Sequence, residues 1–116
     1  MRFNASSFLP LTPAEFQVLV ALADGEKHGY AIIKEVARRT AGKVQIRTGT
    51  LYTVIKRFLA DGLLVESAAR PDPALDDERR RYYRLSERGR AVAVAEADRL
   101  TETLAQARTK LAIRRA

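Results

Sequence analysis

The side chains best suited to act on another molecule are concentrated in residues 48–62. Hydroxyl groups and cations recur within this segment, and no carboxylate occurs before Asp61. Lysine and arginine neutralise phosphate charge, while hydroxyls and the amides of a first helical turn reach phosphates and base edges. On a helix, one face carries Gly49, Thr53, Lys56 and Arg57, flanked by Thr50 and Tyr52. Together with Thr48 at the helix start, these are the candidate DNA-binding residues of the segment. The pattern predicts a helix in the major groove of DNA, and a solvated amphipathic helix is the alternative.

The opposite side of this helix is apolar, as a helix packed on a protein core requires. The apolar stripe consists of Leu51, Val54, Ile55, Phe58 and Leu59. Thr48 is a suitable amino-terminal cap, and Gly62 is a typical residue just past a helix end. We therefore expect one helix that places its cationic, hydroxyl-rich side in solvent.

A second cationic stretch follows a loop rich in acidic residues. Arg79, Arg80 and Arg81 open this stretch, which continues to Arg90. We expect these three arginines to clamp DNA phosphates beside the groove-binding helix. The alternative is a solvated charged face. Asp76 and the other acids of the loop would be repelled by DNA, so we place the contacts at the base of the loop rather than at its tip.

The composition restricts the partners and the chemistry. A chain of 116 residues with 47% hydrophobic residues forms one domain with a modest core, and its net charge of +7 favours nucleic acid, or an acidic membrane surface, as partner. With no cysteine, one histidine, no glycine-rich phosphate loop and no paired carboxylates, we expect no enzyme, no metal and no cofactor. The chain has no signal-like or transmembrane segment, so we expect it in the cytoplasm.

The elements that must position these residues begin after an arm at residues 1–11. Thr12 and Glu15 form a capping box around Pro13, which predicts a helix that ends near residue 24. A second helix is expected over residues 28–40, with His28 at its start rather than in a metal or catalytic site. The linker over residues 41–47 alternates like a very short strand at Val44 and Ile46.

Residues 63–69 and 80–85 read as two strands joined by the loop over residues 70–79. Helix, helix, strand, helix and hairpin is the element order of a winged helix-turn-helix. The fold class is therefore mainly α (α+β), with an amino-terminal arm and winged helix-turn-helix over residues 1–85.

A long helix is expected over residues 86–116, beginning at a Ser86 cap and ending near Arg114. Its apolar residues recur with alternating spacings of four and three, which is the seam of a coiled coil. The seam consists of Ala93, Ala97, Leu100, Leu104, Ala107 and Leu111. Its own domain is too small to cover the seam, so we expect a homodimer. Packing onto the chain's own first helix is the alternative, and one helix can do both.

Several short motifs of the chain are informative in combination, namely Leu11-Thr12, His28-Gly-Tyr-Ala-Ile32, Gly49-Thr-Leu-Tyr52, Asp61-Gly-Leu63 and Arg81-Tyr-Tyr-Arg-Leu-Ser-Glu-Arg-Gly89. Together they resemble the PadR-like family of transcriptional regulators. The resemblance covers residues 11–112 and implies a repressor that dimerises through its carboxy-terminal helix and binds a palindromic operator. The chain departs from the family pattern at Thr53, where proline is usual, and at Phe58, where leucine is usual.

The resemblance also implies that a small aromatic effector releases DNA from many members. The surface expected to bind it lies between two chains and is lined by Phe16, Leu19 and Ala23 with Ala93, Ala97 and Leu100. The alternative is that this surface is packed and binds no effector, since only one helix follows the loop over residues 70–79, which is the wing in family terms. A winged-helix protein-interaction module without DNA is the alternative function, but such a module needs no acid-free cationic face.

Overall fold

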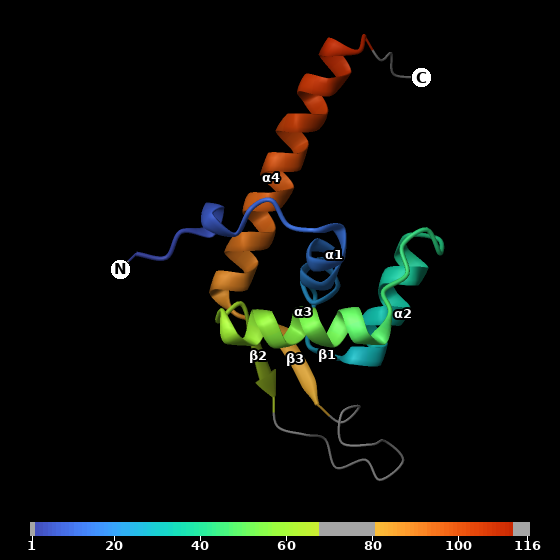
Figure 1. Cartoon of the computed structure of the whole chain (residues 1–116), viewed down its shortest axis with the longest axis vertical. Helices are drawn as coiled ribbons and strands as arrows, with labels where there is room; N and C mark the ends of the chain where they lie inside the picture. Colours follow the sequence, from blue (N-terminus) through green and yellow to red (C-terminus); the bar gives the residue numbers. More distant parts are fainter. Residues whose placement is uncertain (1, 68–80, 113–116) are drawn as a thin grey trace.

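The computed structural model describes residues 2–67 and 81–112. Within these residues, four α-helices and three short strands surround one core, and α4 rises from this body as a long rod (Figure 1). The elements in chain order are η1 (Ala5–Phe8), α1 (Pro13–Ala21), β1 (Lys27–His28), α2 (Gly29–Arg39), α3 (Thr48–Ala60), β2 (Leu64–Ser67), β3 (Tyr82–Leu85) and α4 (Glu87–Lys110). The expected winged helix-turn-helix with a carboxy-terminal helix is confirmed.

The starts of α1 and α2 follow from local side-chain bonds. The Thr12 hydroxyl accepts from the Glu15 amide at 3.1 Å, and the Glu15 carboxylate accepts from the Thr12 amide at 2.7 Å, so the predicted capping box is confirmed. His28 caps α2, because its Nδ1 accepts from the Ala31 amide at 3.1 Å. The interpretation of His28 as the start of a helix is therefore confirmed.

The start of α3 differs from the prediction. Arg47 is the amino-terminal cap and makes no side-chain capping bond, whereas Thr48 is the first helical residue. The prediction of Thr48 as the cap was wrong, because the extended backbone ends at Arg47, one residue earlier. No side chain of the described residues caps the first turn of α3, and no acidic side chain lies in it.

The three strands form one antiparallel sheet in the order β1-β3-β2, with Leu64 opposite Leu85 and Lys27 opposite Tyr83. The prediction of a short strand at Val44 and Ile46 was wrong, because these residues are not in a strand. The third strand of the sheet is β1 instead. The Thr40 hydroxyl donates to the Val36 carbonyl and accepts from the Val44 amide at 3.1 Å. These local bonds hold the linker without a strand partner, and the expected loop over residues 70–79 lies outside the described residues.

The core is formed where α1, α2 and α3 meet above the sheet. Four residues of the predicted α3 stripe are buried, namely Leu51, Val54, Ile55 and Phe58, and Leu59 is partly buried. α4 enters this packing at Gly89, where a β-carbon would overlap the Leu63 carbonyl oxygen. The glycine therefore allows α4 to pass directly against the end of α3.

The amino-terminal arm is packed against α4, as Figure 1 shows. The rings of Phe3 and Phe8 lie 5.8 Å apart, and the Arg88 guanidinium lies 4.9 Å from the centre of the Phe3 ring. The carboxylate of Glu96, which is buried in α4, accepts from the Leu11 amide at 2.7 Å. The arm is therefore ordered by apolar contacts with α4 and by a buried hydrogen bond.

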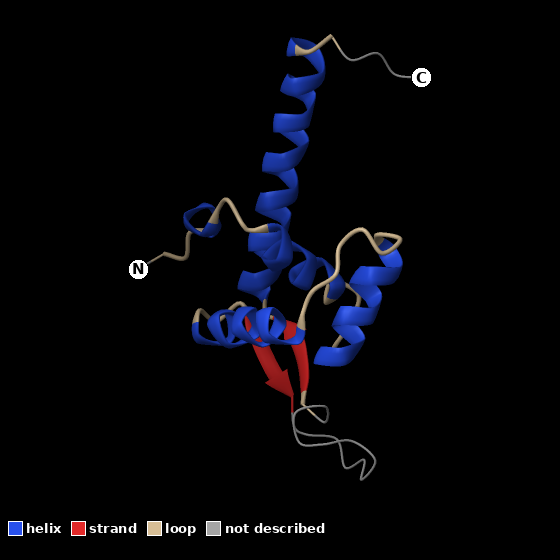
Figure 2. Ribbon diagram, turned by 45° about the vertical axis from the view of Figure 1, so that its right-hand side comes forward, coloured by secondary structure: helices blue, strands red, loops and turns tan. Residues whose placement is uncertain are grey.

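The two halves of α4 have different surroundings. Ala93 in the first half packs against the core, which matches the alternative of intramolecular packing. The second half stands clear of the other described elements in both views (Figures 1 and 2). There Leu100, Leu104 and Leu111 are 39%, 53% and 68% exposed. None of the described helices is both long enough and apolar enough to span a bilayer.

Candidate nucleic-acid interface

The outward face of α3 carries the predicted residues. The buried stripe faces α1 and α2, so the remaining side chains point into solvent. The exposed residues are Thr48, Gly49, Thr50, Thr53, Lys56 and Arg57. A β-carbon at Gly49 would meet no atom within 4 Å, so the backbone of the first turn is open to close approach by another molecule.

Thr53 and Lys56 lie along the middle of this face. The Thr53 hydroxyl donates to the Gly49 carbonyl at 2.9 Å, which restricts its rotamer and leaves its exposed oxygen able to accept. Lys56 makes no ion pair with any residue that the structure describes. The face therefore presents an acceptor and a cation side by side.

Tyr52 is placed differently from its neighbours. Its side chain is partly buried and packs against Gly29 at the start of α2, where an added β-carbon would lie 2.5 Å from the phenol oxygen. Tyr52 thus packs between α3 and the start of α2 and is less exposed than the other residues of the face. Sequence reasoning missed this contact, although Gly29, directly after the His28 cap, is of the residue type that permits close approach.

Arg57 is also engaged within the chain. Its guanidinium lies 3.0 Å from the Glu15 carboxylate and 3.9 Å from that of Asp61. The Glu15 side chain is 8% exposed, whereas that of Arg57 is 65% exposed. Sequence reasoning treated Arg57 as an outward cation without a partner, because a contact between α1 and α3 has no signature in local spacing.

The arginines near the sheet divide into two groups. Arg81 is exposed and lies 3.9 Å from Glu66, while Arg79 and Arg80 lie outside the described residues. Arg90 donates to the Ala23 carbonyl at 2.8 Å, and Arg88 covers an aromatic ring of the arm. Of the predicted phosphate-binding arginines, the structure therefore places Arg81 alone.

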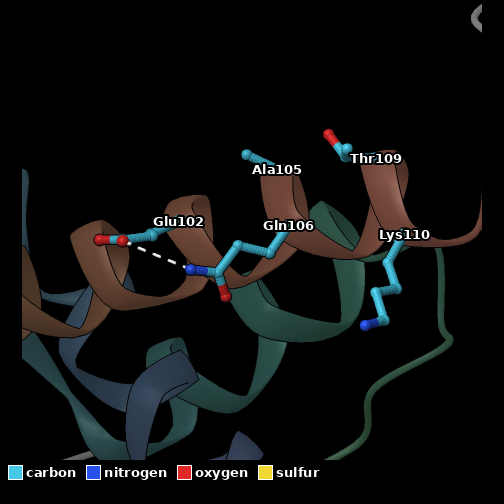
Figure 3. Close-up of a pocket in the computed structure, with 5 residues that line it drawn as sticks. All are labelled: Glu102, Ala105, Gln106, Thr109 and Lys110. Carbon is cyan, nitrogen blue, oxygen red and sulfur yellow. Dashed lines mark hydrogen bonds between the residues drawn. The ribbon is translucent and has the colours of Figure 1, made fainter.

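The surface expected to bind an effector is only partly accessible. Leu19 is fully buried in the core, so it cannot line a cavity between two chains in this conformation, whereas Phe16 is partly buried and Ala23 is exposed. An open hollow lies elsewhere, along one side of outer α4 (Figure 3). It is lined by Glu102, Ala105, Gln106, Thr109 and Lys110. Helical spacing puts it on the side of α4 away from Leu104.

A cationic helix face beside a small antiparallel sheet defines the class of winged-helix DNA-binding proteins. The sequence pattern of the transcriptional regulator PadR-like family matches residues 18–95. The chain belongs to this family, and the resemblance inferred from its motifs is confirmed. It is a DNA-binding transcriptional regulator and not an enzyme.

One relative agrees with this assignment in sequence, and a solved structure agrees in fold. The chain is 37% identical over 89 residues to transcriptional regulator Rv3488 of Mycobacterium tuberculosis, which covers 77% of this chain and 76% of that protein. It is similar in fold to a PadR family transcription regulator from hypervirulent Clostridium difficile, with a TM-score of 0.71 and 20% identity over 86% of this chain and 99% of that one.

A third similar protein is one whose DNA binding is regulated by a small molecule. The chain is 34% identical, with a TM-score of 0.57, to BpsR of Bordetella bronchiseptica, over 80% of this chain and 64% of that one. The BpsR structure addresses the mechanism by which 6-hydroxynicotinic acid regulates its DNA binding.

Proposed function

We propose that the chain is a homodimeric repressor that binds a palindromic operator through α3 of each protomer. The observation that carries the proposal is the outward face of α3. Between residues 48 and 60 this face presents hydroxyls and cations, its first turn has no capping side chain, and the one glycine of the turn is open to solvent. Groups of this kind recognise a duplex by contacting both phosphates and base edges.

The leucines of outer α4 support the dimer. Leu100, Leu104 and Leu111 recur along one side and are exposed in the single chain. A second copy of α4 laid against this row would bury them, because closed symmetric pairing joins identical surfaces. In such a dimer the two α3 helices should lie about 34 Å apart, one turn of duplex.

Contacts with bases and with phosphates should be distinguishable. We expect Lys56→Ala or Thr53→Ala to weaken binding to the operator by roughly 1–3 kcal/mol and to matter far less on random DNA. We expect Arg81→Ala to weaken binding to every duplex and to reduce the slope against log salt by about one unit.

The test begins by selecting bound sequences from a random DNA pool, for which we expect a palindrome with half-sites one helical turn apart. Titrations of the variants at several salt concentrations, against the selected duplex and a scrambled one, then separate the two groups. Wild-type affinity of both Lys56→Ala and Thr53→Ala for the operator would show that α3 does not read DNA.

We propose in addition that an aromatic effector binds between the two chains, near Phe16, Ala23 and Leu100, and releases DNA. The support is the partial exposure of these side chains and the regulation stated for BpsR. The test is a thermal-shift panel of aromatic acids that includes 6-hydroxynicotinic acid. A compound that raises the melting temperature of wild type but not that of Phe16→Ala supports the site. If no compound raises the melting temperature, the protein is a repressor without an effector.

A further inference from the structure

Two buried carboxylates meet at the link between the arm and α1. Among the described residues, Glu15 and Glu96 are the only charged side chains that are buried. Glu15 accepts from the Thr12 amide and Glu96 from the adjacent Leu11 amide, each at 2.7 Å. Because a buried charge is costly unless it is paired, each carboxylate needs a cation for its second oxygen.

The two cations lie on different helices. Arg99 donates to Glu96 from one turn further along α4, so that pair stays within one helix. Arg57 donates to Glu15 from α3 at 3.0 Å, across 42 positions of the chain. Only the second pair reaches the proposed DNA-contacting helix.

The pair with Glu15 restricts the orientation of Arg57. A guanidinium has five N–H groups in a rigid plane, and an arginine in solution loses considerable rotamer freedom when it is held by a ligand. Here a carboxylate that is almost fully buried fixes Nη1, while 65% of the arginine side chain stays exposed. The Arg57 Nε also lies 3.9 Å from the Asp61 carboxylate one turn further along α3. The N–H groups that neither carboxylate uses are therefore held in a set direction before any DNA arrives.

We propose that Glu15 is a positioning residue for DNA binding, which holds the Arg57 guanidinium on the face of α3 for donation to the operator. This inference rests on the proposed function, because it requires α3 to contact DNA. An opposing effect is electrostatic, since the Glu15 charge itself repels DNA. That repulsion acts on every duplex alike, whereas a fixed guanidinium favours the duplex whose groups it matches.

The ratio of affinities for operator and scrambled duplex separates these effects, and Glu15→Gln is the variant of choice. A glutamine carbonyl can still accept from the Thr12 amide, since glutamine serves in a capping box, but its NH₂ group then faces Arg57. We expect the ratio to fall roughly three- to tenfold, the cost of fixing one mobile side chain upon binding. Loss of the charge alone would tighten binding to both duplexes and leave the ratio unchanged.

A double-mutant cycle shows whether Glu15 acts through Arg57. In an Arg57→Ala background, Glu15→Gln should leave the ratio unchanged. Glu96→Gln is the matched control, because it alters the other buried carboxylate and the adjacent amide without touching α3. It should lower the melting temperature while keeping the ratio of wild type, provided that binding is measured well below melting.

A further variant covers the case in which Glu15→Gln does not fold. Arg57→Lys keeps a cation for Glu15 but lacks the planar fork, so we expect a folded chain whose ratio falls as in Glu15→Gln. The proposal is overturned by an unchanged ratio in the variant of Glu15 or in Arg57→Lys, or by an equal fall of the ratio in the Arg57→Ala background. If Lys56→Ala and Thr53→Ala also bind like wild type, the proposed function fails as well; if they bind weakly, only the role of Glu15 fails.

Discussion

Gly29 and Tyr52 are in direct contact, such that a β-carbon on residue 29 would lie 2.5 Å from the phenol oxygen of Tyr52 and 3.2 Å from a methyl carbon of Leu51. This contact joins the start of α2 to the first turns of α3. The angle between α2 and α3 therefore depends on the Tyr52 side chain and on the lack of a side chain at Gly29.

Gly29→Ala should destabilise the fold. The added methyl group has to displace Tyr52 or separate α2 from α3, and overpacking of this kind costs about 1–3 kcal/mol. Urea unfolding followed by circular dichroism measures the loss. Stability equal to that of wild type would mean that Tyr52 moves away without cost, and that it does not set the helix angle.

Gly49→Ala should have the opposite effect on the free protein. Its β-carbon meets no atom within 4 Å, and alanine favours a helix over glycine by up to about 1 kcal/mol. We expect equal or higher stability by urea unfolding together with weaker binding to the operator, because the methyl group occupies the space into which a DNA phosphate would come. A variant that is more stable and binds at full strength would place the DNA away from the first turn of α3.

Leu104→Glu should dissociate the proposed dimer. A carboxylate buried between two chains without a partner costs several kcal/mol, whereas in a monomer it would lie in solvent. Val94→Glu is the control, since Val94 is 54% exposed, close to the 53% of Leu104, but lies on another side of α4. Sedimentation velocity should show a monomer for the first variant and a dimer for the second. A tight dimer in Leu104→Glu would remove outer α4 from the interface.

Acid should weaken the attachment of the arm. The hydrogen bond from Arg99 holds the pKa of Glu96 below its ordinary value of 4.5, although burial opposes this shift. Because the pKa is lower in the folded chain, the stability that Glu96 contributes is complete above that ordinary value and is lost as the pH falls through the folded pKa.

Glu96→Gln should therefore be less stable than wild type near pH 7 and should lose less stability between pH 7 and pH 3. Thermal melts across this range measure both effects. Asp24→Asn is the control, because Lys27 lowers the pKa of Asp24 as well, but that carboxylate is exposed. Parallel pH profiles of wild type and Glu96→Gln would contradict a stabilising role for the buried charge.

The elements that sequence reasoning located correctly are those with two independent local signals. The first helix had the Thr12–Glu15 capping box together with Pro13, and the third had the apolar stripe through Leu51 together with Gly62 past its end. All of these features are present in the structure. The expected strand at Val44 had only one signal, the alternation of two apolar residues. Hydrogen bonds from Thr40 hold that linker instead, and such bonds leave no periodic trace.

The candidate site was predictable in outline but not in its internal contacts. Exposure of Thr53 and Lys56 follows from the position of the apolar stripe, since helical geometry leaves no other direction for them. The engagement of Arg57 by Glu15 and of Tyr52 by Gly29 depends on how three helices pack. Contacts between residues far apart in the chain cannot be read from spacing along one helix.

The uncovered outer half of α4 bears on gene dosage. The outer half of α4 stands clear of the other described elements, and an isolated helical segment of such length is marginal in water. If two chains cover each other's outer α4, dimerisation orders this segment. Its helix content would then rise with the concentration of the protein. At low abundance, occupancy of an operator would then vary with the square of the protein concentration, so halving that concentration would lower the occupancy fourfold rather than twofold.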